Sequence, residues 1–377
     1  MLQRLNFIDI LRGLACIWMI ETHVVNAFLP DGYKDNLIFN LIDISNGFVA
    51  VCFIFCAGAG FRLALESKFK EYITMSAPLL SYVKRLLFIL AIAYWIQTPE
   101  FSLQKTLQSS SEEFSKFFMC NVLQLIVASS LLSLALLIST RSFFRFRIAS
   151  YLILIIFFWC TPFIWSIPQD QLGWIPLFLR MYIVTQPTSL FPLFPWAGYY
   201  FAGIIVTDLF LISQDKDSII KKMIIASLGI TAFAFISKEY LWQYYPSTLN
   251  WWYVSPVHAL FRTAGVMILF SLFYMFKDYC TGKKSAFMQL LGKESLVVYV
   301  GQGMLIYGSV ASKGLQYFLP IIVSPLEVLL LTSGITASMG AYANMWNHFK
   351  RHSPEQAQWV LYAFCTLFVI AFMIIPV

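Results

Sequence analysis

Long apolar runs separated by short polar segments are the dominant pattern in this sequence. An α-helix needs about 20 consecutive apolar residues to cross a bilayer, and about eleven stretches reach that length. They are residues 8–29, 37–61, 79–97, 117–140, 148–167, 191–212, 219–237, 253–276, 286–309, 319–346 and 356–376. The strands of a membrane β-barrel would instead alternate over segments of about 10 residues. The pattern predicts an all-α polytopic transmembrane helical bundle, and because no repeat or linker interrupts it, a single domain over residues 1–377.

The composition supports this prediction and excludes one class of protein. Of the 377 residues, 59% are hydrophobic and 12% are charged, whereas a soluble domain carries about 25% charged residues. So few charged side chains cannot cover a water-facing surface, and a soluble single-core enzyme is therefore excluded. The seven cysteines are odd in number and lie mostly within apolar runs, which does not indicate a disulfide framework.

The positions of lysine and arginine predict the orientation, because short cytoplasmic loops accumulate these residues. With a cytoplasmic N-terminus, most of them fall in inner segments, and a chain of eleven spans ends with an extracytoplasmic C-terminus. The net charge of +7 follows from this bias and does not indicate nucleic-acid binding. Asp9 and Arg12 interrupt the first apolar run, which favours a retained span over a signal peptide. The compact loops suggest a bacterial inner membrane, although an endomembrane would follow the same logic.

Polar side chains mark one face of the first span. Charge at the bilayer centre costs about 2.5 to 3.5 kcal/mol, so ionisable groups there indicate function. At 100° per residue, Arg12 and His23 lie within about 20° of a common line and about 16 Å apart along the helix. The same stripe includes Asp9, Cys16, Met19 and Asn26. In the alternative interpretation, Asp9 and Arg12 neutralise one another at the cytoplasmic interface and His23 caps the outer end.

The eighth span carries a second pair of polar residues. His258 is expected near the outer interface, with Arg262 one turn deeper on nearly the same face. A deep arginine needs a carboxylate, helix-end carbonyls or an anionic ligand. The pair suggests a reaction centre, although His258 alone is equally consistent with an interfacial residue.

His348 and His352 have a spacing that can bind a metal ion. They flank Lys350 and Arg351 in a basic segment, so we expect no metal site. The sequence contains no Gly-rich phosphate loop, G-x-S-x-G, H-E-x-x-H or CxxC pattern, which argues against nucleotide hydrolysis and metal-dependent hydrolysis.

Residues 4–15, with the sequence RLNFIDILRGLA, and the following His23 resemble the opening of the transmembrane acyltransferase superfamily. That superfamily includes the acyltransferase 3 proteins and the heparan-alpha-glucosaminide N-acetyltransferase type, the DUF1624 proteins. Its members share an Arg, then Asp-x-x-Arg-Gly, then a first span. In the acyltransferase 3 branch a histidine at the end of that span is the expected catalytic group, and His23 matches it.

Four later segments are similar to the heparan-acetyltransferase branch. They are residues 53–62 (FIFCAGAGFR), 121–124 (NVLQ), 192–198 (PLFPWAG) and 291–299 (LGKESLVVY). The set runs in order along nearly the whole chain. Animal members of this branch place a histidine in the first outer loop, whereas residues 29–45 contain none here, so the catalytic assignment moves to His23.

The resemblance implies transfer of an acyl group, usually acetyl from cytoplasmic acetyl-CoA, to a hydroxyl or amine of an extracytoplasmic sugar. His23 would act as general base or, alternatively, as a transient acyl carrier, and Asp9 and Arg12 complete the predicted catalytic set. The predicted cofactor-binding residues are Arg12, Arg62, Arg85, Asn121, Gln124 and Trp196, with Lys84 beside Arg85. The predicted substrate-binding residues are Asn26, His258, Arg262, Ser295 and Tyr299. Positive-inside charge, helix–helix hydrogen bonds and aromatic-belt positions are alternative explanations for several of them.

The implied partners are the lipid bilayer, a glycan or glycolipid acceptor and, optionally, a second copy of the chain in a homodimer. A secondary transporter or flippase is the main alternative, because Arg262 and Glu21 would also suit a transport path. Transporters commonly show two matching halves, which this sequence lacks. A sensor or structural subunit is a third interpretation, but such a protein gains little from Asp, Arg and His on one helix line.

Overall fold

The computed structural model describes residues 5–74, 76–244, 250–282, 285–309, 312–319 and 324–375. Helices form nearly all of its regular structure, which confirms the predicted all-α class. The described strands are one short antiparallel pair, β1 (Gly308–Ser309) and β2 (Ser312–Lys313). Arg4, which begins the motif at residues 4–15, lies outside the described residues.

Nine helical segments within the described ranges are long and apolar enough to cross a bilayer, so the chain is a multi-pass membrane protein. They are Leu37–Ile73, which joins α2 (Leu37–Asn46) and α3 (Val49–Ile73), α4 (Ala77–Ile96), α7 (Val122–Thr140), α8 (Phe143–Trp165), α10 (Leu193–Ile212), most of α11 (Lys216–Leu241), α13 (Pro256–Met275), α17 (Pro325–His352) and α18 (Pro354–Ile374). Each overlaps a predicted stretch, although the bounds differ and α3 continues to Ile73, beyond the predicted end at residue 61.

The other two predicted stretches take different forms. Residues 8–29 form α1 (Asn6–Phe28), a helix of 23 residues whose polar side chains reduce its hydropathy. Residues 286–309 are divided at Glu294 into α14 (Ala286–Lys293) and α15 (Ser295–Tyr307). The count of about eleven spans and the orientation remain predictions.

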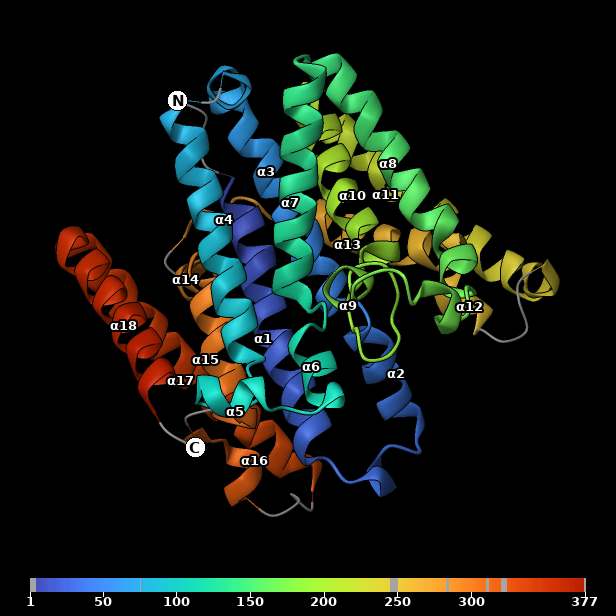
Figure 1. Cartoon of the computed structure of the whole chain (residues 1–377). Coiled ribbons are helices and arrows are strands. Elements are labelled where there is room, and N and C mark those ends of the chain that lie inside the picture. The colour runs from blue at the N-terminus through green and yellow to red at the C-terminus, as the bar shows by residue number, and fades with distance from the viewer. Residues whose placement is uncertain are drawn as a thin grey trace. The chain divides into compact units, whose positions relative to one another are not determined.

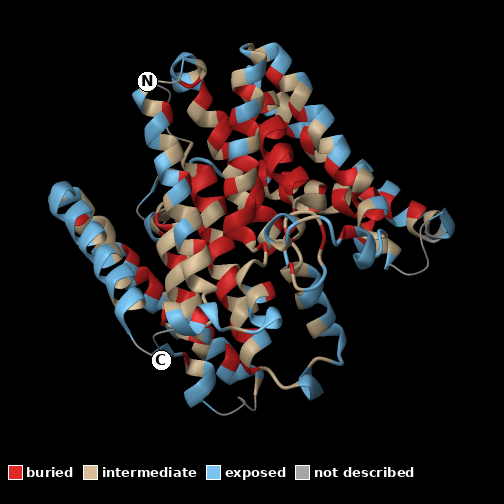
Figure 2. Cartoon of the chain, in the orientation of Figure 1, coloured by how far each residue is buried: buried red, intermediate tan, exposed pale blue. Residues whose placement is uncertain are grey.

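One compact unit combines the two ends of the chain, residues 1–49, 98–113 and 276–377. Helix α1 lies beside α14, α15 and α17, and α18 packs on α17 and on the short helix α5 (Leu103–Leu107) (Figure 1). Its smaller elements are η1 (Asp31–Tyr33), η4 (Tyr279–Thr281) and α16 (Leu315–Phe318). Buried residues concentrate on α1, whereas α18 is mostly exposed within the chain (Figure 2).

The second compact unit contains residues 50–97 and 114–275. Helix α10 packs against α7, α8, α11 and α13, and it is the most buried of the long helices of this unit. Helix α11 lies along α13, and α4 lies along α7. The shorter helices are α6 (Ser111–Phe117), which starts in the first unit, η2 (Gln169–Leu172), α9 (Leu177–Arg180), η3 (Trp242–Tyr244) and α12 (Trp251–Val254).

Local caps fix where several of these helices begin. At the start of α17 the Ser324 hydroxyl accepts a hydrogen bond from the Glu327 N–H, while the Glu327 carboxylate accepts one from the Ser324 N–H. This reciprocal pair is a capping box. The Asn121 side chain caps α7 and that of Ser142 caps α8. Polar residues at the ends of apolar runs therefore set the helix boundaries.

Candidate functional site

Two glycines bring the backbones of α1 and α14 into direct contact. A Cβ built on Gly292 would lie 1.8 Å from the carbonyl oxygen of Asp9, and one built on Gly13 would lie 2.0 Å from that of Met288. Any larger side chain at either position would force the helices apart. Gly13 of the first motif therefore contacts the backbone of α14, and Gly292 of the last motif contacts the backbone of α1. Beside them, the Cys16 thiol donates a hydrogen bond to the Leu291 carbonyl at 3.6 Å.

This contact places the end of α1 against α15, where His23 meets Gln302. The distance from Nδ1 of His23 to Oε1 of Gln302 is 2.9 Å. The Gln302 side chain is buried, and its Nε2 donates to the Tyr299 carbonyl at 3.2 Å. Since a carbonyl only accepts, this second bond turns the amide oxygen toward the imidazole.

The orientation of the Gln302 amide determines the tautomer of His23. An amide oxygen can only accept, so Nδ1 of His23 carries the proton and donates it, which leaves a lone pair on Nε2. The ring of Tyr307 packs edge-on against the imidazole at 5.5 Å between centroids, and its hydroxyl donates to the His23 carbonyl at 3.3 Å. His23 is thereby held with one nitrogen able to take a proton.

The other predicted residues of this unit differ in their surroundings. Asp9 is buried, Arg12 is half-buried and Asn26 is exposed on α1. Ser295 and Tyr299 are half-buried on α15, and their spacing from Gln302 places all three on one helix face. That face is the one that meets His23.

A buried carboxylate links α14 and α15 to α17. Glu294 is 5% exposed, and its two oxygens accept hydrogen bonds from Nζ of Lys350 at 2.7 and 2.8 Å. The Asn347 amide donates to the same carboxylate at 2.6 Å. A buried charge needs such partners, so Glu294 holds the break between α14 and α15 against α17.

In the second unit, Arg62 belongs to a buried ion network. Its Nε donates to Oδ1 of Asp208 at 2.6 Å and its Nη1 donates to Oε1 of Glu66 at 2.5 Å. Arg147 donates to the other Asp208 oxygen. The Arg62 guanidinium also lies 4.8 Å from the centre of the Phe143 ring. Two arginines and two carboxylates therefore connect α3, α8 and α10.

The predicted residues near the start of α7 form a polar group within the same unit. Gln124 is fully buried and its Nε2 donates to Oε1 of Gln97, whose own Nε2 donates to the Met119 carbonyl at 3.0 Å. Oε1 of Gln124 has no hydrogen-bond partner among the described residues. Asn121 caps its own helix, and Arg85 is exposed on α4.

Trp196 and Arg262, predicted for different ligands, lie together. The Arg262 guanidinium carbon is 5.8 Å from the centre of the Trp196 ring, a cation–π arrangement. Among the side chains that the structure describes, no carboxylate pairs with Arg262. His258 is buried one turn away, with its ring 4.9 Å from that of Trp252 and 5.3 Å from that of Tyr253. This part of α13 is thus a cation and an imidazole among aromatic rings.

His348 and His352 stack on one another, with their centroids 3.9 Å apart, near the end of α17. Among the described residues no third histidine, cysteine or carboxylate joins them as a metal ligand.

Several residues in these arrangements were not predicted from the sequence as site residues, and Asp208, Glu294 and Gln302 are the central ones. Asp208 is the only carboxylate in the stretch 191–212, and Gln302 is an uncharged polar residue within the run 286–309. An isolated polar residue in an apolar run is a signal for both. Glu294 lies within a motif that resembles a family segment, but its partner is 56 positions away.

Comparison with known families gives a match over most of the chain. Residues 4–248 match the model of a family described as heparan-alpha-glucosaminide N-acetyltransferase, catalytic. The matched segment includes α1 with His23 and all of the ion network around Arg62. A search of curated proteins finds no matching sequence.

Proposed function

We infer the function from the family: this chain belongs to the heparan-alpha-glucosaminide N-acetyltransferase family and is therefore a membrane acetyltransferase. We propose that it moves an acetyl group from acetyl-CoA to a hydroxyl or amine of an extracytoplasmic sugar. The observation that carries the proposal is the contact between His23 and Gln302. It leaves Nε2 of His23 unprotonated near the end of α1, a helix within the segment that matches the family. A glycan or glycolipid is the acceptor class that this proposal assigns.

His23 acts in this proposal as the general base. Nε2 of His23 takes the proton from the acceptor hydroxyl or amine while the acceptor oxygen or nitrogen forms a bond to the acetyl carbonyl carbon. The carbon–sulfur bond of the thioester breaks, and the proton passes from the imidazolium to the departing thiolate. The amide oxygen of Gln302 accepts a hydrogen bond from Nδ1–H of His23 throughout the step, and this bond stabilises the imidazolium that forms.

The residues of the second unit are candidates for holding the donor. Acetyl-CoA supplies an activated thioester, three phosphate groups and a chain with two amide N–H groups. The buried, unpartnered Oε1 of Gln124 fits an amide N–H, and the exposed guanidinium of Arg85 fits a phosphate. Arg62 is already engaged by Asp208 and Glu66, so within this proposal it shapes the site through those carboxylates.

The test is transfer of labelled acetyl by the purified full-length protein. Incubation with radiolabelled acetyl-CoA and a panel of amino sugars and glycolipids is expected to yield labelled sugar. His23→Ala is expected to lower kcat by about 10²- to 10⁴-fold, the usual contribution of a general base. His348→Ala is the matched control, because it removes an exposed imidazole from α17, and it is expected to retain full activity.

Two results would contradict the proposal. Undiminished transfer by His23→Ala would remove His23 from the chemistry. Movement of a labelled sugar across liposomes, with no label transferred from acetyl-CoA, would instead support the transporter or flippase alternative.

A further inference from the structure

A pocket lies between α14 and the C-terminal part of α17, from Gly340 to Arg351. Its volume is about 540 Å³, within the range of about 300 to 1,000 Å³ typical of small-molecule sites. All of its lining residues come from the two helices, and all belong to the unit that contains both ends of the chain. It lies outside the residues that match the acetyltransferase family.

Two cations in this pocket lack a counter-charge. Lys293 and Arg351 line it, and neither forms a salt bridge within the described part of the chain. The neighbouring carboxylate of Glu294 is already neutralised by Lys350. Lys293 has only a long contact, 3.4 Å, to the Gln289 amide oxygen. Keeping a half-buried ammonium group without a carboxylate is costly, which points to an anionic ligand.

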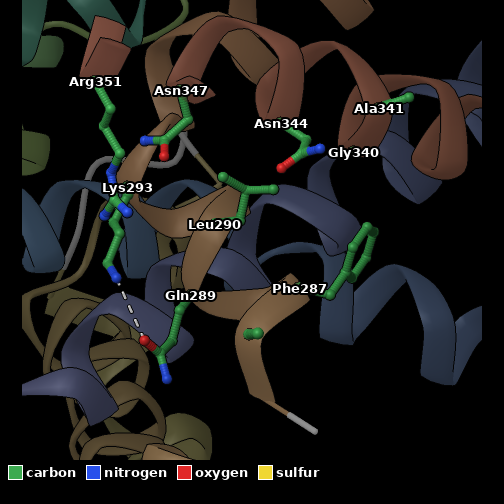
Figure 3. A pocket seen from close by; sticks show the side chains of 10 residues that line it. Phe287, Gln289, Leu290, Lys293, Gly340, Ala341, Asn344, Asn347 and Arg351 are labelled. Carbon is green, nitrogen blue, oxygen red and sulfur yellow. Dashed lines mark hydrogen bonds between the residues drawn. The ribbon is translucent and has the colours of Figure 1, made fainter. Parts of the chain in front are cut away.

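The uncharged polar groups fit the same ligand. The Asn344 amide lines the pocket without a hydrogen bond to another described residue. In Figure 3 it lies beside Gly340, toward Phe287, whereas the guanidinium of Arg351 and the ammonium of Lys293 supply N–H donors on the other side. Such a set suits the oxygens of a phosphate, which arginine binds with paired N–H groups.

An aromatic ring lies at the opposite end of the pocket, beyond Asn344. Figure 3 shows the polar ends of Arg351, Lys293 and Gln289 on one side of the view and the ring of Phe287 on the other. Phe287 is 42% exposed and covers Gly340, where a Cβ would lie 2.3 Å from the ring. Leu290 lies between the two ends. A ligand that satisfies both ends carries a phosphate and an apolar chain.

We propose that this pocket binds the phosphate headgroup of an anionic phospholipid, with an acyl chain along Phe287 and Leu290. The exposure of the neighbouring helices supports a lipid as the source of the phosphate. Only a third of the most apolar stretch of α17 and 6% of that of α18 are buried within the chain. Basic pockets between membrane helices are typical sites for anionic headgroups. The proposal does not depend on acetyl transfer.

The test measures lipid binding to the full-length protein by native mass spectrometry in neutral detergent. Phosphatidylglycerol is expected to bind at one saturable site and to exceed phosphatidylcholine. The double variant Lys293→Gln/Arg351→Gln is expected to weaken phosphatidylglycerol binding by roughly 10- to 30-fold, from two lost charge contacts. Lys293→Arg/Arg351→Lys keeps both charges and is expected to retain binding.

The matched control is Lys221→Gln/Lys222→Gln, which removes two exposed charges from α11 and is expected to leave binding unchanged. An equal loss in this control would overturn the proposal in favour of general surface electrostatics. Displacement of the lipid by inorganic phosphate or by CoA at similar concentrations would also overturn it, because the apolar chain would then contribute nothing. Each variant's circular dichroism and gel-filtration profile distinguishes lost binding from lost folding.

Discussion

At the residue scale, the hydrogen bond between His23 and Gln302 converts an ordinary imidazole into one with a defined free nitrogen. Sequence periodicity predicts that His23 lies on a polar stripe, because that stripe needs only the geometry of one helix. It does not predict Gln302, which lies 279 positions away. The hydropathy of two helices does not indicate that they pack against each other when they are far apart in the sequence.

Gln302 provides a test of positioning that is separate from folding. Gln302→Leu removes the acceptor of the Nδ1 hydrogen, so we expect kcat to fall about 10- to 100-fold with little change in KM for acetyl-CoA. Gln302→Glu keeps an acceptor and is expected to retain most of the activity. Steady-state kinetics with labelled acetyl-CoA measure both, and Gln316→Leu, an exposed site on α16, is the control. Equal activities in the Leu and Glu variants would contradict the assigned tautomer.

Asp208 is the residue on which the ion network of the second unit depends. Asp208→Asn leaves the buried guanidinium of Arg62 with Glu66 as its remaining carboxylate and removes the carboxylate that Arg147 contacts, and breaking a buried ion pair costs up to about 3 to 5 kcal/mol. We expect a clear decrease in the thermal unfolding midpoint of the detergent-solubilised protein. Asp170→Asn, on an exposed 3₁₀ turn, makes the same chemical change outside the network and is expected to leave the midpoint unchanged. An unchanged midpoint for Asp208→Asn would show that the network contributes little.

At the scale of elements, hydropathy predicts most of the long helices and misses one break. The stretch 286–309 is expected as one span, but α14 and α15 separate at Glu294. The sequence Gly292-Lys293-Glu294-Ser295 interrupts this run, but the interruption is shorter than the polar segments that separate the other predicted stretches. The physical cause is the ion pair with Lys350, which holds Glu294 against α17 and becomes visible only when the helices are packed.

The crossing of α1 and α14 gives a prediction about whole helices. Gly292→Ala would place a methyl group within 1.8 Å of the Asp9 carbonyl, and a backbone atom cannot yield as a side chain does. We expect the variant to lose acetyl transfer and to unfold at a lower temperature. Gly334→Ala is the matched control, since nothing lies within 4 Å of a Cβ there, and it is expected to be neutral or slightly stabilising. Wild-type behaviour of both variants would show that α1 and α14 need no close approach.

At the scale of the molecule, the class of the protein is readable from the sequence and the pairing of its helices is not. Composition and run length lead directly to a helical membrane protein. Residues 1–49 and 276–377 belong to one compact unit. The hydropathy pattern does not predict this grouping, because it does not indicate which apolar helix faces pack against each other. The short motifs carry that information indirectly, since Gly13 and Gly292 lie in two of them.

Orientation is the prediction that belongs to the whole chain. With the N-terminus inside, Lys105→Cys is expected to react from outside with a membrane-impermeant maleimide, whereas Lys222→Cys is expected to react only after permeabilisation. Both lysines are exposed. The unsubstituted chain is the control, because it reports any labelling of the native cysteines, of which Cys160 and Cys365 are the least buried. The reverse labelling pattern would invert the assignment of inner and outer ends.

The separation between His23 and its partner also has a consequence for biosynthesis. Chain elongation proceeds at about 5 to 20 residues per second, so the 279 positions between them take between about 14 and 56 s to synthesise. During that interval α1, with Asp9, Glu21 and His23, exists without α14 and α15. His23 therefore meets Gln302 only late in translation, and a ribosome that stalls before residue 302 would yield a chain in which the imidazole lacks this partner.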